Sequence, residues 1–170
     1  YSQFTSTLPA DVPHLADGGV LASLPPGNWT YAWPRDGAYA IVGMAYAGMH
    51  EEAAEALRYM LEADTDRYRN YDELAGVPVG PYAISLCRHH GFGVEESETL
   101  GGGDFNFEFD GAGLFLFALD HYLRASGDTT FVDTHWETIR DEVAGFLVPL
   151  IDPVTNLIVR DSSIWEHHWL

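Results

Sequence analysis

The expected fold depends on the stretch GAYAIVGMAYAGM, at residues 37–49. It contains no charged side chain, and every face of a helix built from it is apolar or small, which predicts a helix buried on all sides. The segment that follows, 51–66, is amphipathic instead. Its apolar stripe consists of Ala53, Ala54, Leu57, Met60 and Leu61. A fully apolar helix is thus followed directly by one with a single apolar face.

The same alternation occurs a second time along the chain. Residues 111–123 read GAGLFLFALDHYL, and residues 130–150 are amphipathic. The apolar stripe expected there is Val132, Trp136, Ile139, Val143, Phe146, Leu147 and Leu150. Two such pairs predict an all-α fold of two layers, with the apolar helices inside and the amphipathic helices outside. An ordinary helical bundle with two central helices is the alternative.

The rest of the chain is predicted to be irregular, with short β-hairpins in the loops. Residues 1–28 contain several prolines and glycines and form an irregular lead-in to the domain at 29–170. A glycine-rich stretch at 71–106 separates the two helical pairs, and a connection of that length is usually functional or structured. Residues 82–88 and 152–160 are expected to contain short strands.

The charge of the chain excludes some classes of partner. The 170 residues carry 8 basic and 26 acidic side chains, a formal net charge of −18, and every basic residue is arginine. Nucleic acids and anionic membranes need clustered cations, so neither is an expected partner. An uncharged sugar fits the 14% aromatic content, although the charge is equally explained as a solvated surface. No signal peptide is visible, which favours a soluble, cytoplasmic protein without establishing the compartment.

Three clusters combine aromatic and charged side chains, at residues 29–36, 104–110 and 165–169. The first two precede the apolar helices, so in a two-layer fold they share one rim. Aromatic rings fit the C–H faces of sugars, while carboxylates and arginine bind hydroxyl groups. Glycosidic cleavage needs an acid for the leaving oxygen and a second carboxylate. The alternatives are that Asp36 and Asp110 cap helices, that the aromatic residues are core anchors, and that Glu166 is a surface acid.

Other chemistry is not supported by the motifs. The pairs His89-His90 and His167-His168 lack the spacing of a helical zinc site, so no metal is expected. The triplet at 101–103 lacks the pattern of a dinucleotide-binding loop, so no cofactor is expected. Cys87, next to Arg88 and His89, is a candidate nucleophile, but the expected role is that of a part-buried structural thiol.

Three motifs in order resemble the glucoamylase-like family 15 glycoside hydrolases, over roughly residues 29–169. Residues 31–36, YAWPRD, resemble the family's Y-x-W-x-R-D signature, and 108–114 resemble its Q-x-D-x-x-G segment, with Glu108 in place of Gln. Residues 163–166, SIWE, resemble the tryptophan–glutamate motif that holds the general acid, with His167 in place of a second Glu. The resemblance implies an (α/α)₆ barrel, a helical toroid.

The resemblance also implies roles for individual residues. Glu166 is expected to be the general acid, and Arg35 and Asp36 to hydrogen-bond the terminal glucose. Trp33 and Trp165 are expected to line the pocket. The residues expected to bind substrate are Tyr31, Trp33, Arg35, Asp36, Glu108, Asp110 and Trp165.

The activity implied by the resemblance is that of an exo-acting, inverting α-glucosidase, which releases glucose from the non-reducing ends of α-glucosides. The linkage stays open between starch-type, isomaltose-type and trehalose substrates. Inversion needs a general base, which the family carries in the C-terminal part of its barrel. The chain is therefore expected to be the N-terminal part of the barrel, inactive alone and partnered by the missing part. The alternative is a non-catalytic, carbohydrate-binding or regulatory relative.

Overall fold

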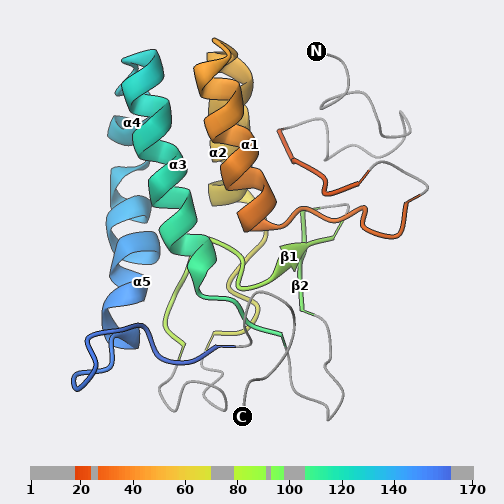
Figure 1. The fold of residues 1–170 in the computed structure, drawn as a ribbon. Helices are drawn as coiled ribbons and strands as arrows, with labels where there is room; N and C mark the ends of the chain where they lie inside the picture. Colours follow the sequence, from red (N-terminus) through yellow and green to blue (C-terminus); the bar gives the residue numbers. More distant parts are fainter. Residues whose placement is uncertain (1–17, 24–26, 70–78, 91–92, 98–105, 162–170) are drawn as a thin grey trace.

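The computed structural model describes residues 18–23, 27–69, 79–90, 93–97 and 106–161, and these residues are mostly helical (Figure 1). The helices are α1 (Pro34–Tyr46), α2 (His50–Glu62), α3 (Asp110–Ser126), α4 (Thr130–Thr138) and α5 (Gly145–Leu147). A π-helical turn, Ile139–Ala144, joins α4 to α5, and a 3₁₀ turn, Val148–Leu150, follows α5. Two short strands, β1 (Arg88–His89) and β2 (Glu95–Glu96), form an antiparallel pair in the long connection. The predictions of a mostly helical chain and of a short hairpin in this loop are confirmed.

The inner helices α1 and α3 lie side by side and run in the same direction (Figure 1). Arg35 contacts Asp110 near the start of both helices, and Tyr46 contacts His121 near their far ends, both at a sequence separation of 75. Helix α2 packs behind α1, and the segment containing α4 and α5 runs along α3. The two helical pairs predicted from the sequence are thus present, with equivalent positions of α1 and α3 in contact.

Local sequence explains how closely the starts of α1 and α3 approach. Pro34 occupies the first turn of α1, where a missing N–H is tolerated, so the helix begins before the predicted position 37. A Cβ at Gly111 would lie only 3.1 Å from Cβ of Pro34 and 3.3 Å from the carbonyl oxygen of Ser85. Glycine at position 111 therefore allows the two helix starts, and the side chains that they carry, to come together.

The core lies between the inner helices and the helices behind them. Its largest fully buried side chains are aromatic and branched aliphatic, and they come from helices and from the connection 79–90. They include Ile41, Leu57, Tyr82, Ile84, Leu86, Phe107, Phe109, Phe115, Tyr122 and Leu150. Burial of each such side chain stabilises the fold by about 1.5–3 kcal/mol.

The prediction that both inner helices are buried on all sides is wrong for the described part of the chain. Tyr39 and Tyr46 of α1 are 60% and 63% exposed, and Phe117 of α3 is 43% exposed. The Tyr39 ring contacts that of Phe117, and the rings of Tyr46 and Phe117 both contact His121. The exposed positions of α1 and α3 thus include a group of neighbouring aromatic rings. No helix in the described residues is both long enough and apolar enough to cross a membrane.

The apolar stripe of the last helical segment differs from the predicted one in its first half. Phe131 is buried, whereas Trp136 is 51% exposed and Val132 is only half-buried. Ile139 and Val143 are buried as predicted. The π-helical turn explains the difference, because its wider turns accommodate one extra residue and shift the preceding positions by about one.

A buried carboxylate organises the connection between the helical pairs. Glu95 is fully buried and accepts hydrogen bonds from the Tyr82 hydroxyl at 2.7 Å and from the Leu86 N–H at 2.8 Å. It also accepts one from the Arg67 N–H at 3.1 Å. The strand predicted at 82–88 is reduced to β1. The N–H groups of Ala83 and Leu86 there bond to the Glu142 carbonyl oxygen and the Glu95 carboxylate instead of to a neighbouring strand. The strand predicted at 152–160 is likewise a turn closed by one bridge between Ile151 and Ile158.

Candidate functional site

Three charged side chains from two separate motifs meet where α1 and α3 begin. Nη2 of Arg35 lies 2.9 Å from Oε2 of Glu108 and 2.9 Å from Oδ2 of Asp110. Nε of Arg35 donates a second hydrogen bond to Oδ2 of Asp110 at 3.0 Å. One guanidinium thus holds two carboxylates, each predicted to lie at the substrate site, and fixes the YAWPRD motif to the second motif.

Glu108 is the most perturbed acid of this ionic cluster. Its side chain is 8% exposed, and burial raises its pKa to about 7, although the positive charge of Arg35 opposes the shift. The neighbouring carboxylate of Asp110 raises the pKa further, and the Asn106 amide, which donates to Oε1 at 3.4 Å, lowers it. Glu108 can therefore gain or lose a proton near neutral pH, which is a property of functional carboxyl groups.

A groove opens beside Asp110 at the start of α3. It has a volume of about 420 Å³, and its walls are largely apolar. Its lining residues are Phe109, Asp110, Gly113, Leu147, Ile158, Val159, Arg160 and Asp161. The Asp161 carboxylate also accepts the N–H of Phe109 at 2.9 Å, which fixes the chain after α5 to the start of α3. Apolar walls with carboxylates among them suit a ligand that has C–H faces and hydroxyl groups.

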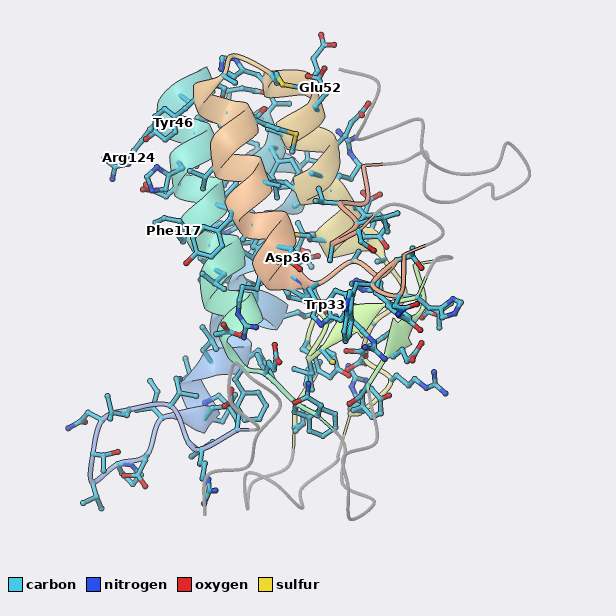
Figure 2. All side chains as sticks on the ribbon, turned by 45° about the vertical axis from the view of Figure 1, so that its right-hand side comes forward. Trp33, Asp36, Tyr46, Glu52, Phe117 and Arg124 are labelled. Atoms are coloured by element: carbon cyan, nitrogen blue, oxygen red, sulfur yellow. The ribbon has the colours of Figure 1, made fainter. Side chains whose placement is uncertain are left out.

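Asp36 stands apart from the ionic cluster. It belongs to the first turn of α1 and is exposed, at the end of the helix next to Trp33 (Figure 2). Partial burial raises the pKa of its carboxyl group, and the charge of Arg35 opposes that effect. The carboxylate remains accessible to a ligand. The N-cap residue of α1 is Trp33, so Asp36 lies within the first turn and does not occupy the capping position considered as the alternative.

The aromatic residues of the first motif form a second cluster. The ring centroids of Trp29 and Trp33 lie 6.1 Å apart, and those of Tyr31 and Trp33 lie 5.6 Å apart, edge to face. Trp29 is 54% exposed, and the other two rings are half-buried. Such pairs are favourable at these separations. The rings are therefore surface groups that support one another, rather than the core anchors considered as the alternative.

The backbone at Ala32 extends the small sheet and decides which side chains share a face. Ala32 and His89 exchange two backbone hydrogen bonds, of 3.1 Å and 2.8 Å. Successive side chains of a strand point to opposite faces. Tyr31 and Trp33 consequently share the outer face with Arg88, whereas Ala32 and His89 point to the core.

Arg88 is a member of this aromatic cluster that the sequence analysis did not identify. Its guanidinium carbon lies 4.1 Å from the ring centroid of Tyr31 and 5.3 Å from that of Trp33. Nη2 pairs with Oε1 of Glu96 at 3.1 Å across the β1–β2 pair. The sequence could not reveal this role, because β1 and β2 have two residues each and are too short to show a strand periodicity.

On the core face of the same sheet, His89 is buried beside Tyr59. Their ring centroids are 5.6 Å apart, and neither His89 Nε2 nor the Tyr59 hydroxyl has a hydrogen-bond partner among the described residues. Burial lowers the pKa of His89 to about 4 and raises that of Tyr59 to about 12. His89 is thus a neutral core residue at pH 7.

The remaining predicted residues have other outcomes. Glu166 and Trp165 lie outside the described residues, as do His167 and His168. Cys87 is buried, which agrees with a structural thiol. No three His, Cys, Asp or Glu side chains within the described ranges are grouped to hold a metal ion.

Comparison of the chain with protein-family models, with curated proteins and with solved structures finds no match.

Proposed function

We propose that this chain forms part of an exo-acting, inverting α-glucosidase of the glucoamylase-like kind. The observation that supports the proposal best is the Arg35 guanidinium, which holds both Glu108 and Asp110. It joins the first two motifs of the resemblance, which are far apart in the sequence, at one end of two parallel helices. A chance match of two short motifs would not require their side chains to meet.

The two clusters supply the interactions that a terminal glucose needs. Arg35 and Asp36 provide a charged donor and an acceptor for hydroxyl groups, and charge-assisted hydrogen bonds are stronger than neutral ones. Tyr31 and Trp33 provide ring faces for the apolar side of the sugar. Asp110 supports the site by orienting Arg35.

The exposed face of the inner helices agrees with a partial toroid. Tyr39, Tyr46 and Phe117 form a run of large rings with no covering layer among the described elements. Exposed apolar patches of this kind often mark interaction surfaces. In the proposed (α/α)₆ barrel, further inner helices would cover these rings, and those helices would come from the C-terminal part.

In the proposed reaction, Glu166 donates its proton to the glycosidic oxygen while the bond from that oxygen to the anomeric carbon breaks. A water molecule attacks the anomeric carbon from the opposite face and loses a proton to a general base. Inversion places the two carboxyl groups about 6.5–9.5 Å apart, which leaves room for the water. The proposal assigns the acid and the glucose-binding side chains to this chain and the base to the C-terminal part.

Substituting Glu166 by Gln in the whole gene product tests the assignment of the acid. Glucose release from maltose, isomaltose or trehalose should fall about 10²–10⁴-fold, because the amide has no proton to give to the leaving oxygen. Glu137→Gln, an exposed residue of α4, is the matched control and should retain full activity. Undiminished glucose release by Glu166→Gln would remove this residue as the acid. Glucoside binding by the unsubstituted protein without any glucose release would favour the non-catalytic relative.

A further inference from the structure

We propose that Arg88, paired with Glu96, is a positioning residue that holds the rings of Tyr31 and Trp33 in the orientation in which they stack on a sugar. The ligand here is the α-glucoside of the proposed function, on which this inference rests. Nothing in the three motifs includes Arg88 or Glu96, and both belong to the small sheet in the loop between the helical pairs.

Arg88 lies against both aromatic rings of the YAWPRD segment. The guanidinium carbon of Arg88 lies 4.1 Å from the centroid of the Tyr31 ring, which is a contact of the planar group with the ring face. The Trp33 ring is within 5.3 Å of the same carbon, and both distances are within the range of cation–π interactions. Because the two rings meet each other edge to face, one guanidinium fixes both of their orientations.

Arg88 is itself held in place by burial and by its ion pair with Glu96. Arg88 is only 3% exposed, and a buried charge is costly unless it is paired. Its partner Glu96 lies directly across β1 and β2 in the antiparallel register and is held by the strand pairing. The guanidinium therefore has little freedom, and the rings that rest on it have little freedom either.

Backbone pairing places Arg88 beside the YAWPRD segment. Tyr31 and Trp33 flank Ala32, whose two backbone hydrogen bonds to His89 attach the YAWPRD segment to β1. Arg88 precedes His89 in that strand, so the same pairing brings it against the rings. Side chains that are ordered before a ligand arrives lose less conformational entropy on binding, which strengthens binding.

The test compares four variants of the whole gene product. Arg88→Lys keeps the charge without the planar group, Arg88→Met removes both, and Glu96→Gln removes the partner. Arg124→Met is the matched control, because Arg124 also pairs with one carboxylate, Asp120, but lies exposed on α3. Fluorine NMR of protein labelled with 5-fluorotryptophan reports on the Trp33 ring, whose resonance Trp33→Phe assigns. The KM and kcat for maltose report on substrate.

The expected result is a shifted Trp33 resonance and a KM raised about tenfold in both Arg88 variants, with a kcat within about twofold of the original. Glu96→Gln should raise KM about threefold, and Arg124→Met should change neither the resonance nor KM. An unchanged resonance in Arg88→Lys, or a shifted resonance with an unchanged KM, overturns the inference. If the unsubstituted protein neither binds nor cleaves α-glucosides, the proposed function fails, and the resonance alone still decides whether Arg88 positions Trp33.

Discussion

Substituting Glu95 by Ala should destabilise the fold by about 3–5 kcal/mol, the largest effect expected of any single stability change. The fully buried carboxylate accepts hydrogen bonds from the Tyr82 hydroxyl and from the backbone N–H groups of Leu86 and Arg67. Alanine leaves the Tyr82 hydroxyl and the Leu86 N–H without this partner in a buried site, and each such loss costs about 1–3 kcal/mol, whereas the Arg67 N–H is only part-buried. Because domains of this size are stable by about 5–15 kcal/mol, much of the stability would be lost.

Urea unfolding of the chain measures this effect, with Glu137→Gln as the control. Glu137 is an exposed acid of α4, so its substitution should change the free energy of unfolding by less than about 0.5 kcal/mol. Glu95→Gln should lie between the two, since the amide keeps one acceptor but presents N–H groups to donors. A change below about 1 kcal/mol for Glu95→Ala would show that this hydrogen-bond network does not stabilise the connection.

Glu108 and His89 are buried groups whose effects on the pH dependence of stability have opposite signs. Removing either one should therefore reveal the pH dependence that the remaining group causes. Burial raises the pKa of Glu108 from 4.5 to about 7 and lowers the pKa of His89 from 6.5 to about 4. The folded state therefore binds a proton on Glu108 more readily than the unfolded state does, and it binds one on His89 less readily. Each shift corresponds to about 3 kcal/mol, since one pKa unit is worth about 1.4 kcal/mol.

The two contributions have opposite signs. Glu108 stabilises the fold most below pH 4.5, and that contribution is lost as the pH rises through 7. His89 stabilises it most above pH 6.5, and that contribution is lost as the pH falls through 4. In the unsubstituted chain the two slopes nearly cancel between pH 4.5 and 6.5.

Urea unfolding at pH 7 and pH 4.5 separates the two groups. Between pH 7 and pH 4.5, the free energy of unfolding of Glu108→Gln should fall by about 3 kcal/mol relative to that of the unsubstituted chain, because only the His89 effect remains. The free energy of unfolding of His89→Phe should rise by about 3 kcal/mol over the same pH change, again relative to the unsubstituted chain. Subtracting the unsubstituted chain removes the titration of the other acids. Parallel pH profiles for all three proteins would contradict this account of the two buried groups.

The elements that the sequence predicted best are those with a strong local pattern. The uncharged stretches 37–46 and 111–119 lie in α1 and α3, and their repeated order predicted that the two helices would be equivalent. That equivalence also predicted a shared rim for the residues that precede them, and the contact of Arg35 with Asp110 is an instance of it.

Features that depend on non-local pairing could not be predicted in the same way. The role of Arg88 follows from backbone pairing between Ala32 and His89, far apart in sequence and confined to a few residues. The Glu95 network likewise depends on how the connection folds. The apolar stripe of α4 was predicted wrongly for another reason. A π-helical turn does not change the composition of a segment, so a search for a 3.6-residue period does not detect it.

The stereochemistry of the first product tests whether the protein is an inverting α-glucosidase. Proton NMR of the whole gene product acting on phenyl α-glucoside, whose leaving group is not a second glucose, distinguishes the anomers of glucose as they form, before they interconvert. An inverting α-glucosidase should release β-glucose from the non-reducing end first, with the α-anomer appearing only later by mutarotation. Initial release of α-glucose, or no release from any α-glucoside, would contradict the assignment.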